Sequence, residues 1–108
     1  MATKTYNKLV RDLIPDIIKK SGNECRTKIL SDDEYLKMLD AKLDEELSEY
    51  HKDQNIEELA DLLELIYAAA IARGYTLADL EATRAEKANS RGGFEKKILL
   101  IDVTEKEA

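Results

Sequence analysis

A helical hairpin is predicted by the stretch Lys42-Leu-Asp-Glu-Glu-Leu-Ser-Glu-Tyr-His-Lys-Asp-Gln-Asn-Ile-Glu-Glu-Leu-Ala-Asp-Leu-Leu-Glu64, which holds nine carboxylates in 23 residues. Leucines recur between the acids at helical spacing, as in helices that bury one face. Asp53-Gln-Asn55 interrupts the pattern, and short polar breaks join antiparallel helices. The stretch therefore predicts two helices folded back on each other, with much negative charge beside their apolar faces.

The flanking sequence extends these two helices and adds further elements. Capping and breaking residues predict helices over 12–21, 32–52, 55–73 and 76–89. Ser31 and Glu34 form the capping-box signature before the longest of them. Residues 26–30 and 97–103 are β-rich enough to form a two-stranded ribbon. We therefore expect one all-α domain over residues 1–108, with a small β ribbon attached.

The composition excludes several classes of protein. The chain has 108 residues, 37% of them charged and 6% aromatic, a mixture that favours helices. Its net charge of −6 repels polyanions, so nucleic acid is not an expected partner. The single cysteine, Cys25, excludes an internal disulfide framework and suits a reducing cytosol. No apolar run reaches the roughly 20 residues of a membrane span, and no signal peptide is visible. We expect a cytoplasmic protein that does not bind membranes.

The acids of the 32–52 helix differ in how close they lie to its apolar side. On a wheel of about 100° per residue, Glu46 lies about 60° from the centre of the apolar arc and Glu49 about 120°. Glu45 lies nearly opposite the arc, so we expect it to be solvated. The arc itself consists of Leu36, Leu39, Leu43, Leu47 and Tyr50.

Folding the chain back near residues 53–54 would bring four carboxylates together. Glu49 then faces Glu58, and Glu46 faces Asp61. Without a cation, repulsion and desolvation would favour protonation of some of these groups. An all-oxygen cluster suits a hard cation, above all Mg²⁺, with Mn²⁺ as a substitute. A solvated acidic face would explain the same spacing without a metal, and the pattern alone leaves both interpretations open.

Two short motifs resemble a known enzyme superfamily. Glu45-Glu46-Leu-Ser-Glu49 followed by Glu58-Leu-Ala-Asp61 is similar to the EExxE…ExxD signature of the MazG-type all-α nucleoside triphosphate pyrophosphohydrolases. Flanking blocks resemble the phosphoribosyl-ATP-pyrophosphohydrolase-like, or house-cleaning, branch, and the similarity spans roughly residues 6–100. These blocks are Tyr6-Asn-Lys-Leu-Val-Arg-Asp-Leu-Ile-Pro15, Lys42-Leu-Asp-Glu-Glu46, and Lys87 with Arg91-Gly-Gly-Phe94. Only eight residues separate Glu49 from Glu58, fewer than in many members, which puts loop-borne substrate contacts in doubt.

The resemblance implies Mg²⁺-dependent hydrolysis of a nucleoside triphosphate, canonical or modified, to the monophosphate and pyrophosphate. The matching metal-binding and catalytic residues are Glu46, Glu49, Glu58 and Asp61. The matching blocks also supply cations for the phosphates, namely Lys8, Arg11, Lys42, Lys87 and Arg91. An ordinary salt bridge to Glu46 explains Lys42 equally well, and a plain helix-to-strand turn is the alternative for Arg91-Gly-Gly. The nucleotide, the number of metal ions and the general base are left open.

The helix predicted over 55–73 implies association. Its residues 59–72 are apolar almost all round, and the other predicted helices are too few to cover them. We therefore expect a homodimer, or a higher homo-oligomer, that completes a helical bundle. The alternative from another class is a non-catalytic acidic interaction module, or a regulatory protein that binds nucleotides without cleaving them.

Overall fold

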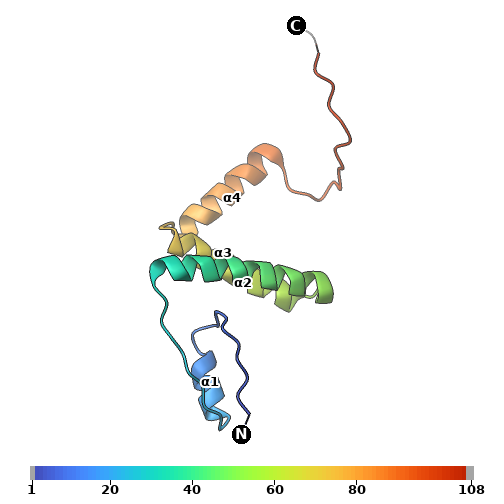
Figure 1. Ribbon diagram of the computed structural model, residues 1–108. Coiled ribbons are helices and arrows are strands. Elements are labelled where there is room, and N and C mark those ends of the chain that lie inside the picture. Colours follow the sequence, from blue (N-terminus) through green and yellow to red (C-terminus); the bar gives the residue numbers. More distant parts are fainter. Residues whose placement is uncertain (1, 107–108) are drawn as a thin grey trace. The chain divides into compact units, whose positions relative to one another are not determined.

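The computed structural model describes residues 2–106, and within this range all regular structure is helical (Figure 1). The helices are α1 (Ile14–Lys20), α2 (Asp32–Asp53), α3 (Ile56–Ala72) and α4 (Leu77–Arg91). The predicted all-α class is confirmed, and each helix lies where the capping and breaking residues predict it. None of these helices combines the length and the hydropathy needed to cross a membrane.

The chain divides into two compact units. The first runs to Leu77 and contains α1, α2 and α3, whereas the second starts at Ala78 and contains nearly all of α4 and the segment after it. The carboxylates of the predicted site and three of its five predicted cations belong to the first unit.

The predicted β ribbon is wrong. Residues 26–30 and 97–103 contain no strand, and Lys97 adopts a positive φ of 59°, which is incompatible with extended pairing. Except for the half-buried Leu30, their apolar side chains are open to solvent, with Ile29 94% and Ile101 86% exposed. β-propensity mainly reflects packing against neighbours on a sheet. These segments have β-forming residues but no such neighbours in their own units.

Ser31 starts α2 through the predicted capping box. Its hydroxyl accepts a hydrogen bond from the Glu34 N–H at 3.3 Å and lies 3.1 Å from Glu34 Oε1. Lys28 adds an ion pair to the same carboxylate at 3.4 Å. The hydrogen bond from the Ser31 side chain and the contact with Lys28 lower the pKa of Glu34. The first turn of α2 is therefore held by side chains that the sequence places there.

A two-residue connection reverses the chain between α2 and α3. Gln54 adopts the left-handed conformation, with φ 51° and ψ 35°, and its N–H donates to the Tyr50 carbonyl at 2.8 Å. Asn55 then caps α3, because its Oδ1 accepts from the Glu58 N–H at 3.0 Å. So short a link leaves the helices antiparallel and side by side, and they are the helix pair in contact within residues 2–106 (Figure 1).

The two sides of α3 have different surroundings. One side is half-buried and carries Leu62, Leu65, Ala68, Ala69 and Ala72. The opposite side is apolar but open: Ile56, Leu59, Leu63 and Ile66 are 76%, 44%, 46% and 42% exposed. Leu39 of α2, at 2% exposure, is the one fully buried residue in the described part of the chain. The hairpin thus covers only one stripe of an almost wholly apolar helix.

Loss of the Asn55 cap should loosen the hairpin. Asn55→Ala removes the acceptor of the Glu58 N–H, and we expect it to lower the free energy of unfolding by about 1 kcal/mol. Asn55→Ser, which keeps a capping oxygen, should retain most of that stability. Urea unfolding followed by circular dichroism measures both variants. Equal stability of Asn55→Ala and the wild type would show that the cap does not hold the turn.

Candidate metal centre

Three carboxylates from α2 and α3 converge beside the turn. Glu46 lies on α2, and Glu58 and Asp61 lie one turn apart on α3. One oxygen of each carboxylate lies within 4.8 Å of the others, and all three residues are half-buried. The predicted approach of Glu46 to Asp61 is therefore present in the fold. The cap at Asn55 starts α3 at the register that places Glu58 and Asp61 on its half-buried side.

A second acidic group shares Glu58 with the first. Glu49, Asp53 and Glu58 also offer oxygens within 4.8 Å of one another. The predicted contact of Glu49 with Glu58 is thus present, but the acids form two overlapping groups where a single quadrilateral was expected. Asp53 was missed because it was interpreted as part of the break. Its spacing could have identified it, since it follows Glu49 by four residues and shares its side of the helix.

Glu58 belongs to both groups, so the negative charges of the other acids repel its carboxylate. Desolvation raises the pKa of its carboxyl, and the charges of Glu46, Asp53, Asp61 and Glu49 raise it further. Within the described residues no lysine or arginine pairs with Glu58, whereas Glu46 and Asp61 each have a cationic partner. A half-buried acid with acidic neighbours and no counter-ion is a favourable place for a bound cation.

The donor set fits a hard divalent cation. Every donor is a carboxylate oxygen, the ligand type that Mg²⁺ and Mn²⁺ prefer. An octahedral ion with bonds of about 2.1 Å spaces its ligands by roughly 3–4 Å. Carboxylate oxygens within 4.8 Å of one another reach that spacing by small side-chain adjustments. Glu46, Glu58 and Asp61 would hold the ion, with Glu49 and Asp53 beside it.

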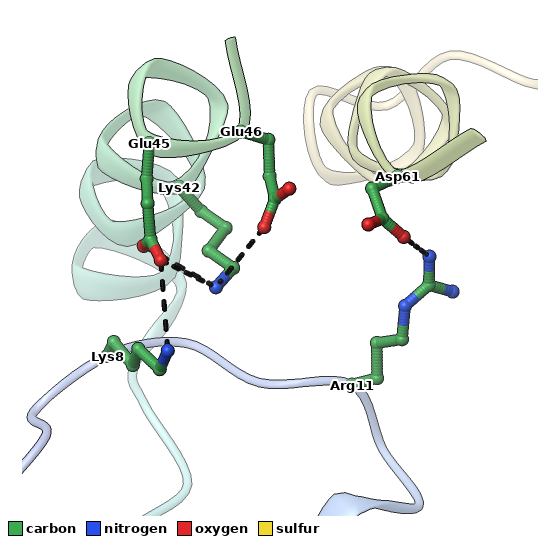
Figure 2. Close-up of polar contacts among 6 residues, drawn as sticks. All are labelled: Lys8, Arg11, Lys42, Glu45, Glu46 and Asp61. Carbon is green, nitrogen blue, oxygen red and sulfur yellow. Dashed lines mark hydrogen bonds and ion pairs between the residues drawn. The ribbon is translucent and has the colours of Figure 1, made fainter. Parts of the chain in front are cut away.

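Three of the predicted cations pair with acids of α2 and α3 (Figure 2). Arg11 and Lys42 reach members of the first group, whereas Lys8 reaches Glu45, which belongs to neither group. Lys8 and Arg11 come from the segment before α1: Lys8 Nζ lies 3.7 Å from Glu45 Oε1, and an Arg11 guanidinium nitrogen lies 2.6 Å from Asp61 Oδ1. Lys42 lies 3.4 Å from Glu45 and 3.6 Å from Glu46. The salt bridge that was the alternative interpretation of Lys42 is therefore present.

Glu45 and Glu46 differ in the order that the helical wheel predicts. The Glu46 side chain is 14% exposed and the Glu45 side chain 41%. Glu45 does not stand alone in solvent, however, because it pairs with Lys8 and Lys42. The wheel could not predict the pair with Lys8, which lies far away in the sequence, whereas the pair with Lys42 joins residues three apart on α2.

Lys87 and Arg91, the two remaining predicted cations, lie on exposed turns of α4 in the second unit. Arg91 is the last residue of α4, so this helix extends two residues beyond its predicted end at Asn89. Gly92 ends α4 with φ +83°, and its N–H donates to the Ala88 carbonyl at 2.8 Å. The contact of Lys87 and Arg91 with phosphate stays a prediction.

Comparisons with known proteins give little guidance. No protein-family model matches the chain, and no solved structure matches it. Over 41 residues it is 58% identical to an uncharacterised protein of Mycolicibacterium smegmatis. That match covers 38% of this chain and 42% of the relative, so the chain spans less than half of the relative's length. The function therefore has to be argued from the site.

The raised pKa of Glu58 predicts a pH-dependent stability in the absence of metal. Over a range of pH the folded chain retains a proton on Glu58 that the unfolded chain releases. The stabilising contribution of this group to the free energy of unfolding is therefore present at low pH and is lost as the pH rises through its folded-state pKa. In EDTA, Glu58→Gln should therefore melt above the wild type at pH 7. The difference should shrink toward about pH 5, near the ordinary range of glutamate.

Glu57→Gln is the matched control for this measurement, because Glu57 is the exposed neighbour of Glu58 on the same helix. Its difference from the wild type should vary little with pH. A Glu58→Gln difference as flat as that of Glu57→Gln would contradict the electrostatic account of Glu58.

Proposed function

We propose that the protein is a Mg²⁺-dependent nucleoside triphosphate pyrophosphohydrolase that yields the nucleoside monophosphate and pyrophosphate. The observation that carries the proposal is the half-buried group of Glu46, Glu58 and Asp61, in which Glu58 has no cationic partner among the described residues. The resemblance of the two carboxylate motifs to the MazG-type enzymes supports the same chemistry. The free Cys25 and the nucleotide substrate fit a cytoplasmic protein.

The charges around the group suit a polyphosphate. A triphosphate is strongly anionic and would be repelled by the acids alone, but Lys8, Arg11 and Lys42 lie beside them. Acids that hold a divalent cation next to basic side chains that meet phosphate oxygens are the recurring arrangement of phosphoryl-transfer sites. An interaction surface without chemistry has no need for cations from a separate segment at the same acids.

The acidic and basic residues have different roles in the proposed hydrolysis. Mg²⁺, when bound, would supply neutralisation of the phosphate oxygens and activation of the attacking water. Glu46, Glu58 and Asp61 hold the cation, and the neighbouring acids Glu49 and Asp53 offer a base for the attacking water. The water oxygen bonds to phosphorus, the bond to the bridging oxygen breaks, and pyrophosphate leaves. Lys8, Arg11 and Lys42 hold the phosphates in place.

Loss of a carboxylate from the group should abolish most of this activity. Glu46→Gln and Glu58→Gln keep the side-chain shape but weaken the bond to a hard cation, so pyrophosphate release should fall by more than about 100-fold. Glu57→Gln, the exposed neighbour, should stay close to the wild type. A panel of canonical and modified nucleoside triphosphates with Mg²⁺ and pyrophosphate detection measures the effect. Full metal-dependent activity of both variants would show that these carboxylates do not form the catalytic metal site. Release of inorganic phosphate alone would contradict cleavage to the monophosphate and pyrophosphate.

We also propose that a second copy of the chain covers the open side of α3, forming a homodimer that completes a helical bundle. Ile56, Leu59, Leu63 and Ile66 repeat every three or four residues, which is the spacing of a seam between packed helices. Exposed apolar side chains in a continuous stripe are typical of association surfaces. A single chain with one fully buried side chain among residues 2–106 has little other means of removing apolar surface from water.

The proposed dimer seam, formed by Ile56, Leu59, Leu63 and Ile66, predicts the molecular mass in solution and how mutation changes it. Light scattering of the wild type should give at least twice 12.3 kDa. Replacing Leu63 and Ile66 together by Gln should reduce the mass toward that of one chain, because it removes two apolar contacts per copy. Glu64→Gln, between them in sequence, should leave the mass unchanged. A monomeric wild type would refute the seam.

A further inference from the structure

An arginine from the N-terminal segment forms an ion pair with one of the acids that are proposed to bind the cation. The Arg11 guanidinium nitrogen lies 2.6 Å from Asp61 Oδ1, across 50 positions of sequence. Asp61 also belongs to the group in which its carboxylate approaches those of Glu46 and Glu58. The same carboxylate group is therefore in reach of a guanidinium and of a cation bound to the three acids.

We propose that Arg11 is an exchangeable counter-ion of the site. In the metal-free protein it neutralises Asp61, and when the divalent cation binds Asp61, Arg11 passes to a phosphate of the incoming nucleotide. This inference rests on the proposed function and adds to it a defined role for one residue. The exchange follows from charge: a divalent ion bound to Asp61 would lie within a few ångströms of the guanidinium, and these two positive charges repel each other.

The surroundings of Arg11 allow such a movement. Its side chain is 58% exposed and belongs to a segment without regular secondary structure, and exposed ion pairs are weak enough to exchange. Lys42 differs in each respect, since it lies on α2, is 15% exposed and contacts two carboxylates. The planar guanidinium also matches two phosphate oxygens at once, which an ammonium does not.

The N-terminal segment has a second ion pair with the helical hairpin besides that of Arg11. Lys8 attaches the segment to Glu45 of α2, while Arg11 attaches it to Asp61 of α3 (Figure 2). With Lys8 still paired, Arg11 would move only by its own side chain. The released guanidinium would stay beside the cation, where the phosphates of the nucleotide have to bind.

The first test measures metal affinity without nucleotide. Titration of Mn²⁺ into the wild type and Arg11→Gln at fixed ionic strength should show about two- to fivefold tighter binding to the variant, the factor expected for loss of a competing exposed ion pair. Lys28→Gln is the matched control, because Lys28 forms an exposed ion pair with Glu34 at the start of α2. It makes the same change of net charge and should leave the affinity unchanged. Equal or weaker Mn²⁺ binding by Arg11→Gln would overturn the competition.

The second test measures the transfer to phosphate. With Mg²⁺ present, Arg11→Gln should raise the KM for the nucleotide by about tenfold or more, the scale of one lost charge-assisted hydrogen bond. Arg11→Lys should recover part of the loss. An unchanged KM would overturn the transfer. A wild type that binds Mn²⁺ but releases no pyrophosphate from any nucleotide would refute the proposed function instead, while the Mn²⁺ titration would still decide whether Arg11 competes.

Discussion

The reversal of the chain at Gln54 and Asn55 is the constraint on which the rest of the structure depends. Two residues join α2 to α3, with Gln54 in the left-handed region and Asn55 capping the second helix. So short a link permits one antiparallel register, and that register determines which acids meet. A longer connection would let the helices slide past each other, and their acids would separate into solvated rows. The turn thus converts an ordinary acidic sequence into groups of carboxylates that share one space.

The proposed metal site contains an electrostatically unfavourable group, the carboxylate of Glu58. Glu58 is half-buried among acids, and desolvation together with these charges raises the pKa of its carboxyl. Sites of this kind are often less stable than the scaffold around them, because their function requires unbalanced charge. Arg11 and Lys42 offset part of the repulsion, while Glu58 has no cationic partner within residues 2–106. The open apolar side of α3 is the surface that the proposed homodimer would remove from water.

The sequence predicts the local features of this fold well. The helix positions and the Ser31 cap follow from local residues, whereas Asn55 was interpreted only as part of the break and its capping role was missed. The approach of Glu46 to Asp61 follows from helical periodicity combined with the polar break. The strands failed because pairing depends on neighbours that propensity does not reveal. The contact of Arg11 with Asp61 could not be derived either, since no local rule relates residues 50 positions apart. Helical periodicity finds sites made by adjacent elements, whereas contacts from distant segments require the folded chain.

The proposed chemistry requires Glu46, Glu58 and Asp61 to bind a divalent cation. Anomalous diffraction from crystals grown with Mn²⁺ tests it most directly, because it locates the ion without assuming any activity. The account predicts a peak between these three carboxylates, about 2.1–2.2 Å from an oxygen of each. It also predicts that the Arg11 guanidinium has left Asp61. Crystals at millimolar Mn²⁺ with no ion at these carboxylates, and Arg11 still paired with Asp61, would contradict it.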